Sequence, residues 1–435
     1  MAMSSVDLLY GRGTLSVSIP EGCMPTVIRK RPMPIIQDPA SQIAEALANP
    51  VGVPSLKQLA REAASACILI CDITRPVPNG LFLGPLIRVL MSGGIARERI
   101  SILVATGLHR PNLGQELGEL INDPWVLKTV AVHNHDARSD DDHATLGTTP
   151  NGVRVRLDRR LVEADLRIAT GLVEPHLMAG YSGGRKVIAP GVAHAETITT
   201  LHNSTFMSNP LATNCVLEGN PLHEEQLEIV KMLGGALALN TVIDEQRRLS
   251  FVNFGEIIQS HLEAVGFTRE FSEVSLPMRF NTVVTSAAGY PLDKTYYQTI
   301  KGIVGPLDIV EPGGDLIVAS ECSEGLGSGD FQEAQRRLVE QGEEGFLATI
   351  ADKPHAAIDE WQTQMQLRTS RTAKIHLVSG LDAVDRQLTN VQIAESVEAA
   401  LVASMARHGT SKVAFIPEGP YIVPRKAMPN TYRNP

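Results

Sequence analysis

The residues best equipped for chemistry lie in one irregular stretch, 171–202, which reads GLVEPHLMAGYSGGRKVIAPGVAHAETITTLH. It contains His176, His194, His202 and Lys186. Glycines and prolines interrupt the whole stretch, which disfavours a regular helix or strand. An irregular segment of this length inside a globular chain is usually functional or disordered. The histidines and the lysine, flanked by small residues that leave room for a ligand, favour a functional segment.

Lys186 has two interpretations, a surface lysine after a flexible loop or a nucleophilic amine. The P-loop pattern requires Ser or Thr after the lysine, and Val187 stands there instead. A lysine becomes nucleophilic when burial or a neighbouring cation lowers its pKa, and Arg185 is adjacent. Gly183 and Gly184 would let backbone amides approach a phosphate group.

Three short apolar runs each end at side chains that can do chemistry. The runs are 67–71, 101–105 and 166–169, and the side chains that follow them include Asp72 and Arg75, then His109, then His176. Helical segments separate the runs, and strands that alternate with helices predict a parallel sheet. Ligands bind outside the carboxyl ends of such strands. We therefore expect these side chains to line a single crevice.

Further elements follow from local patterns. Residues 6–18 predict a hairpin, Ser55 caps a helix, and 221–270 has a helical character. In the second half, strands are expected at 281–287, 315–320, 374–380 and 412–419. A helix capped by Asp293 would place Tyr297, Gln298 and Lys301 on neighbouring positions of one surface.

The 435 residues are too many for one ordinary core, so two α/β domains with mainly parallel sheets are expected. We place the first at 1–270, the second at 278–400 and a loose tail at 426–435. The boundary lies where mixed charge and Pro277 change the character of the chain.

Composition narrows the class of protein. The net charge of −9 and 4% aromatic content argue against nucleic-acid binding. No apolar run approaches the length of a membrane span, and five scattered cysteines are typical of a reducing compartment. The start of the chain has no signal-peptide pattern, so a cytoplasmic location is expected.

The remaining histidines are less telling. His133, His135 and His143 lie among aspartates, which favours a solvated loop or an adventitious metal patch. His194 follows a Pro-Gly turn and reads as solvated. No HExxH or paired CxxC spacing occurs, so any bound metal would have few protein ligands.

The combined residues suit a small carboxylate substrate, because His109 and His176 can titrate near neutral pH beside an arginine and a lysine. Two bases in one site suit a reaction that treats both faces of one carbon alike. A racemase or epimerase fits, and a plain divalent-metal hydrolase or lyase fits nearly as well.

At this point the chain resembles the nickel-dependent lactate racemase family, from LLYGRG to IVPR. The resemblance rests on DITRP at 72–76, ATGLHRP at 105–111, EPHLMAGYSGGRKVIAPGVA at 174–193, LHN at 201–203 and YYQTIKG at 296–302. These motifs are long and specific.

The resemblance implies a nickel-pincer nucleotide, a pyridinium mononucleotide that holds nickel through one carbon and two sulfur atoms. It implies that Lys186 tethers this cofactor through a thioamide and that His202 supplies the fourth nickel ligand. His109 and His176 would be the acid/base pair. Substrate contacts would come from Arg75, Tyr297, Gln298, Lys301 and Trp361, and Asp72 and Thr74 would lie near the cofactor.

The implied reaction is racemisation of a small 2-hydroxy acid, lactate-like or malate-like, by proton-coupled hydride transfer. The implied fold has the active site in the cleft between two α/β domains, with 403–425 returning to the first. Proteins of cofactor biosynthesis are expected partners. A diacid would need an extra cation or hydrogen-bond donor, for which Arg110 or Arg185 is a candidate. A non-catalytic carrier of the nickel cofactor is a further alternative, although a carrier would need only Lys186 and His202.

Overall fold

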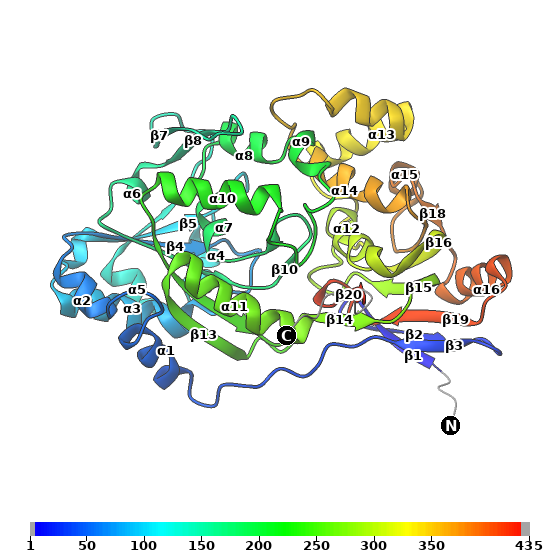
Figure 1. The fold of residues 1–435 in the computed structure, drawn as a ribbon, viewed down its shortest axis with the longest axis horizontal. Coiled ribbons are helices and arrows are strands. Elements are labelled where there is room, and N and C mark those ends of the chain that lie inside the picture. Colours follow the sequence, from blue (N-terminus) through cyan, green and yellow to red (C-terminus); the bar gives the residue numbers. More distant parts are fainter. Residues whose placement is uncertain (1–4, 428–435) are drawn as a thin grey trace, which may run out of the picture. The chain divides into compact units, whose positions relative to one another are not determined.

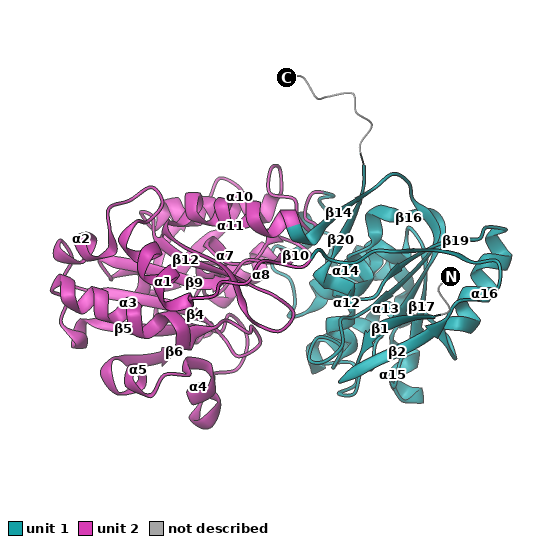
Figure 2. Cartoon of the chain, turned by 90° about the horizontal axis from the view of Figure 1, so that it is seen from below, with its two compact units in different colours: residues 1–31, 203–210, 271–435 teal, residues 32–202, 211–270 magenta. Residues whose placement is uncertain are grey.

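The computed structural model describes residues 5–427, so the predicted tail lies almost wholly outside the described residues. The chain forms two compact units. Unit 1 comprises residues 1–31, 203–210 and 271–435, and unit 2 comprises 32–202 and 211–270 (Figure 2). None of the described helices is long and apolar enough to cross a membrane.

Unit 2 is built on a six-stranded sheet in the order β13-β12-β9-β4-β5-β6. All neighbours are parallel except β12 and β13. The strands of unit 2 are β4 (Ala66–Cys71), β5 (Ile100–Ala105), β6 (Ala131–Asn134), β7 (His143–Thr148), β8 (Arg154–Asp158), β9 (Leu166–Leu172), β10 (Pro175–His176), β11 (Gly180–Tyr181), β12 (Leu237–Ile243) and β13 (Leu249–Glu256).

The helices of unit 2 are α1 (Pro39–Ala48), α2 (Leu56–Arg61), α3 (Asn79–Gly93), α4 (Gly114–Ile121), α5 (Pro124–Thr129), α6 (Arg159–Val162), α7 (Arg185–Ile188), α8 (Ala195–Leu201), α10 (Pro221–Met232) and α11 (Ile257–Ser272). Helices α1, α2 and α3, blue in Figure 1, share one apolar core with the sheet. Helix α7 packs against β4 and β9. Ile68, Leu69 and Ile70 of β4 are completely buried, which explains why this strand is continuously apolar.

Unit 1 contains a second six-stranded sheet, in the order β18-β17-β16-β15-β19-β3, and all of its strands are parallel. The strands of unit 1 are β1 (Ser5–Tyr10), β2 (Gly13–Ser18), β3 (Met24–Val27), β14 (Glu273–Leu276), β15 (Phe280–Ser286), β16 (Val310–Ala319), β17 (Lys374–Val378), β18 (Gln392–Ile393), β19 (Lys412–Ile416) and β20 (Val423–Lys426). Its helices are α9 (Ser204–Met207), α12 (Tyr296–Val304), α13 (Gly329–Ile350), α14 (Glu360–Ser370), α15 (Ala383–Leu388) and α16 (Val397–His408).

Several local predictions are confirmed. The N-terminal hairpin forms between β1 and β2. Ser55 caps α2 by accepting a hydrogen bond from the Gln58 amide at 3.3 Å. The α/β class with mainly parallel sheets is also observed in both units.

The division of the chain differs from the predicted one at both ends of the sequence. Residues 1–31 were assigned to the first domain, yet β3 pairs with β19 in the sheet of unit 1. The segment 403–425 was expected to return to the first domain, but β20 pairs with β14, also in unit 1. Strand pairing between distant segments leaves no local pattern, so a linear reading assigns both ends to the wrong neighbour.

Two further expectations need correction. The segment 221–270, read as helical, contains the strand pair β12 and β13 between α10 and α11. Thr295, not Asp293, caps α12. The buried Asp293 carboxylate instead accepts hydrogen bonds from the amides of Gly11 at 2.6 Å and Glu321 at 3.2 Å.

Candidate active site

The predicted edge of the first sheet exists, because β4 lies between β5 and β9 and is parallel to both. From β4 the chain moves outward through β5 and β6, and β9 then lies on the other side of β4. The sheet therefore has its topological switch point between β4 and β9. In open α/β sheets, ligands bind outside the carboxyl ends of the strands at such a point.

The loop after β4 presents Asp72, which lies beside His109 of the loop after β5. The Asp72 Oδ2 atom is 2.6 Å from His109 Nδ1. The Oδ1 atom accepts hydrogen bonds from the Thr74 amide at 3.1 Å and the Thr74 hydroxyl at 2.5 Å. Burial alone would raise the pKa of Asp72, but the hydrogen bonds from His109 and Thr74 lower it overall. An ionised carboxylate therefore orients the His109 ring, whose side chain is 62% exposed.

An ion pair spans the switch point. Arg75 Nη1, from the loop after β4, lies 2.5 Å from Glu174 Oε1, which follows β9. The pair fixes the guanidinium of the residue proposed to bind the substrate carboxylate. Glu174 was not singled out in the sequence, although it stands two residues before His176 in the EPH motif. An acidic residue beside a candidate base was the available signal.

His176 lies on a short hairpin formed by β10 and β11, in which it pairs with Gly180. Its Nδ1 atom accepts hydrogen bonds from the amides of Met178 at 3.3 Å and Ala179 at 3.2 Å. The turn of the hairpin thus holds the His176 ring in place through these two amides. Arg185 donates a hydrogen bond to the carbonyl of Ala179, in the same turn, at 2.9 Å.

Lys186 lies in α7, the short helix that packs against β4 and β9. Burial lowers the pKa of Lys186 to about 7, and the positive charge of Arg75 acts in the same direction. The amine is therefore partly neutral at physiological pH, as a nucleophile requires. Burial raises the pKa of the nearby Cys71 thiol to about 12.

The two glycines before Lys186 have a structural reason to be glycine. Gly183 and Gly184 have φ values of +77° and +48°, which side chains disfavour. A Cβ at Gly183 would lie 2.8 Å from the Leu172 carbonyl oxygen, and one at Gly184 would lie 2.9 Å from the His261 ring. Close packing and backbone conformation thus explain why both positions are glycine. Contact of their backbone amides with a cofactor phosphate stays a prediction.

His202 follows the last residue of α8 and caps its carboxyl end. Its Nδ1 atom lies 2.8 Å from the Ile198 carbonyl oxygen, which can only accept, so Nδ1 carries the hydrogen. Burial lowers the pKa of His202 to about 4. At neutral pH the ring is neutral and Nε2 holds the lone pair, which is the form that binds a metal.

The donor set fits a metal that brings most of its own ligands. Within residues 5–427, no group of three or more His, Cys, Asp or Glu side chains is placed to hold an ion. A neutral histidine and a partly neutral buried lysine suit the nickel-pincer nucleotide that the motifs imply.

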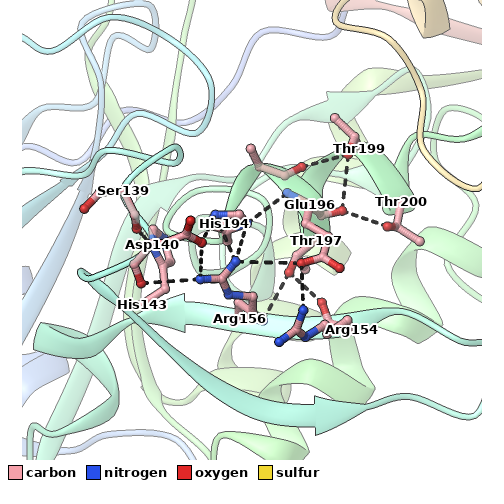
Figure 3. Close-up of polar contacts among 11 residues, drawn as sticks. Ser139, Asp140, His143, Arg154, Arg156, His194, Glu196, Thr197, Thr199 and Thr200 are labelled. Carbon is pink, nitrogen blue, oxygen red and sulfur yellow. Dashed lines mark hydrogen bonds and ion pairs between the residues drawn. The ribbon is translucent and has the colours of Figure 1, made fainter.

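His194 and His143, which were predicted to be solvated, are instead part of a packed cluster at the amino end of α8 (Figure 3). His194 caps the helix by accepting from the Glu196 amide at 3.1 Å. Arg156 lies against the His194 ring and bonds Asp140 at 2.6 Å. The ring of the buried His143 packs edge-on against His194, with centroids 5.0 Å apart. This cluster anchors the helix that ends at His202.

Buried His135 extends this cluster beyond His143, with ring centroids 5.0 Å apart. Its Nδ1 lies 3.2 Å from Asp158 Oδ2, and its Nε2 lies 3.0 Å from the Ala193 carbonyl oxygen. The prediction of a solvated loop is therefore wrong for His135 and His143, because the β7–β8 hairpin folds onto α8. His133 of β6 is exposed.

The candidate residues of unit 1 lie on two helices that pack together, α12 and α14. Tyr297, Gln298 and Lys301 are half-buried on α12, whereas Tyr296, Thr299 and Ile300 face the core. The predicted common surface is thus observed. Trp361 lies on α14 and is buried, and the neighbouring Gln362 amide donates to the Tyr297 carbonyl at 2.9 Å. The Gln298 Oε1 atom is buried without a hydrogen-bond partner among residues 5–427.

The fold defines an α/β protein with His109 in the loop after β5, His176 after β9, and Lys186 in the helix packed against β4 and β9. Comparison with known proteins identifies the family. The lactate racemase N-terminal domain matches residues 10–214, and the lactate racemase C-terminal domain matches 277–423. The chain therefore belongs to the lactate racemase family of isomerases.

Individual relatives agree over nearly the whole chain. A lactate racemase of Thermoanaerobacterium thermosaccharolyticum is 30% identical over 98% of this chain and 100% of the relative. A lactate racemase of Lactiplantibacillus plantarum is 29% identical over 96% of this chain and 99% of the relative.

Solved structures show the same fold. The apoprotein of the T. thermosaccharolyticum lactate racemase matches with a TM-score of 0.89 at 30% identity, over 97% of this chain and 100% of that one. A Thermotoga maritima protein shares the fold with a TM-score of 0.65 at 17% identity, over 89% of this chain and 98% of that one.

Proposed function

We propose that this chain racemises a small 2-hydroxy monocarboxylate of the lactate type with a nickel-pincer nucleotide. The observation that carries the proposal is the sheet edge of unit 2, where His109 and His176 follow strands that flank β4. Lys186 belongs to the helix packed on the same strands. Two proton-transferring groups suit a reaction that must serve both enantiomers.

The roles proposed for the chain's own residues follow their chemistry. His109 and His176 exchange the hydroxyl proton of the substrate. Arg75, held by Glu174, pairs with the substrate carboxylate. Tyr297, Gln298, Lys301 and Trp361 are proposed as further substrate-binding residues, as the family resemblance implies. When bound to Lys186 and His202, the nucleotide would supply the acceptor and donor of the C2 hydride.

A monocarboxylate is favoured over a diacid because both candidate cations for a second carboxylate are engaged. Arg110 forms a two-bonded pair with Glu116, with distances of 2.7 and 2.8 Å. Arg185 is 2% exposed and donates to the carbonyls of Ala179 and Tyr181. We expect faster turnover of lactate than of malate by the loaded enzyme, measured by polarimetry on each single enantiomer.

The decisive test is an intact mass with peptide mapping of Lys186, on protein from cells that also make the cofactor. Because the chain would receive its cofactor from biosynthetic proteins, expression without them should give an unmodified lysine. Lys186→Ala should lose both the adduct and the activity. Lys231→Ala, at a side chain that is 78% exposed, should keep both. An unmodified Lys186 from a competent source would contradict the proposal.

Substrate labelled with deuterium at C2 distinguishes hydride transfer from the alternative mechanisms. The label should survive racemisation, since a transferred hydride does not exchange with water. Washout of the label would indicate a carbanion, as in a plain-metal lyase. Such an enzyme would also recover activity within minutes when a divalent ion is added to the stripped protein. A carrier would leave every enantiomer unchanged.

A further inference from the structure

The two candidate acid/base histidines differ in which ring nitrogen carries the hydrogen. For His109 the deciding contact is the Asp72 carboxylate, 2.6 Å from Nδ1. An ionised carboxylate only accepts hydrogen bonds, so Nδ1 must be the N–H atom. In the neutral ring, Nε2 then holds the lone pair and can take a proton.

For His176 the deciding contacts are with hydrogen-bond donors instead of an acceptor. The amides of Met178 and Ala179, 3.3 and 3.2 Å away, both point at Nδ1. A backbone amide only donates, so Nδ1 must be the acceptor and carries no hydrogen in the neutral ring. The hydrogen then lies on Nε2. The hairpin geometry enforces this arrangement, because His176 pairs with Gly180 across the turn that supplies both amides.

We propose that His109 and His176 rest in opposite neutral tautomers, so that His109 begins as a proton acceptor and His176 as a hydrogen-bond donor. This inference deepens the proposed function, and its catalytic meaning rests on it. A substrate hydroxyl facing His109 meets a lone pair at once. A hydroxyl facing His176 meets an N–H group, and proton transfer there requires the ring to release both amides.

The tautomers can be measured without any turnover. Ring ¹⁵N shifts of the full-length, cofactor-free chain labelled with ¹⁵N-histidine distinguish an N–H from a bare ring nitrogen at each position. His109→Gln and His176→Gln assign the two rings by loss of their signals. We expect the Nδ1–H pattern for His109 and the Nε2–H pattern for His176. The same pattern in both rings would overturn the inference.

Asp72→Asn provides a directed perturbation. The Thr74 amide and hydroxyl both donate to Oδ1, so the amide oxygen of the new side chain should stay there. Its NH₂ group would then face His109 and force Nδ1 to accept, which reverses the tautomer of that ring. The His176 pattern should not change. An unchanged His109 pattern would contradict the orienting role of Asp72.

The loaded enzyme gives a second readout. In single turnovers, the rate constants for the two pure enantiomers should differ, and Asp72→Asn should slow the faster one by ~10²–10⁴-fold. Equal single-turnover rate constants would count against the inference. If the ring shifts are as expected but no 2-hydroxy acid is racemised, the proposed function fails while the tautomer assignment holds.

Discussion

At the scale of single residues, the site depends on groups whose ionisation the fold has changed. Burial keeps the His202 imidazole neutral at physiological pH, and it lowers the pKa of Lys186 to about 7, so that this amine is partly neutral. Arg75 and Asp72 keep their charges because each has a partner within hydrogen-bonding distance. Under the proposed function, the charged residues would hold the substrate and orient a base, whereas His202 and Lys186 would serve metal binding and covalent attachment.

The lowered pKa of Lys186 predicts unusual reactivity. In the cofactor-free protein, the initial rate at which an amine-acetylating reagent modifies Lys186 should be half its maximum at a pH of about 7, measured by peptide mapping. The exposed Lys57 serves as the internal standard for the reagent. Labelling of Lys186 only near pH 10 would show that burial does not neutralise it.

The same shift has a consequence for stability. The folded chain releases the Lys186 proton at about pH 7, whereas the ordinary value is 10.5. Between these values the unfolded chain binds more protons, so this group makes the protein more stable as the pH rises. Urea midpoints of the cofactor-free protein should show this rise, and Lys186→Met should reduce it. An equal rise in the variant would contradict the assignment.

The proposed acid/base roles of His109 and His176 predict that activity can be lost while the cofactor stays bound. His109→Ala and His176→Ala should each lower racemisation by ~10²–10⁴-fold. The mass of the adduct on Lys186 should persist in both variants. His133→Ala, at an exposed side chain of β6, is the control and should retain activity. Two active histidine variants would exclude the two-base scheme.

At the scale of elements, the loop from β9 to α7 is held by α11. The buried His261 of α11 lies 2.8 Å from the Ser182 carbonyl oxygen and 3.1 Å from Arg185 Nη1. Its ring occupies the space that a side chain at Gly184 would need. Helix α11 therefore packs against the loop that runs between His176 and Lys186 and holds it in place.

This packing predicts that Gly184→Ala is strongly destabilising. Backbone strain at φ +48° should cost ~1–3 kcal/mol, and the clash with the buried His261 ring adds to it. The urea midpoint of the cofactor-free protein, followed by the fluorescence of Trp125 in unit 2, should fall. Gly266→Ala is the matched control on α11, since a Cβ there meets nothing within 4 Å. The Gly266→Ala variant should have an unchanged or higher urea midpoint, since alanine stabilises a helix by up to ~1 kcal/mol relative to glycine.

At the scale of the whole molecule, unit 1 has a buried polar anchor of its own. In unit 1 the anchor is Asp315 of β16, which is completely buried. It accepts from the Ser404 hydroxyl at 2.6 Å and lies 2.8 Å from His376 Nε2, and it also pairs with Arg407. These contacts join β16, β17 and α16 at the edge opposite the carboxyl ends of the strands.

Removing this anchor should destabilise unit 1. Asp315→Ala should cost roughly 2–4 kcal/mol, because it leaves several buried donors without an acceptor. Trp361 reports on this unit, so the urea midpoint is best measured by its fluorescence in a Trp125→Phe background. Glu333→Gln, in an exposed ion pair of α13, is the control and should not shift the midpoint. An unshifted midpoint for Asp315→Ala would contradict the assigned role.

The sequence by itself determined the class of fold and the sheet edge at which Asp72, His109 and His176 lie. Apolar runs that end in Asp72, His109 and His176 are local patterns, and strands that alternate with helices pair in parallel. The motifs around Lys186 and His202 were likewise sufficient to indicate the family, because each motif is a continuous segment of the sequence.

Only the tertiary structure decided which atoms meet. Segments far apart in the chain meet in the hydrogen bond from His109 to Asp72, in the Arg75–Glu174 ion pair and around the buried Lys186. Such hydrogen bonds form only when the atoms are placed to within a fraction of an ångström. The addition of β3 to the sheet of unit 1 and the packing of His143 against α8 have the same origin. Long-range pairing is set by which surfaces bury each other, and no local period of the sequence records that choice.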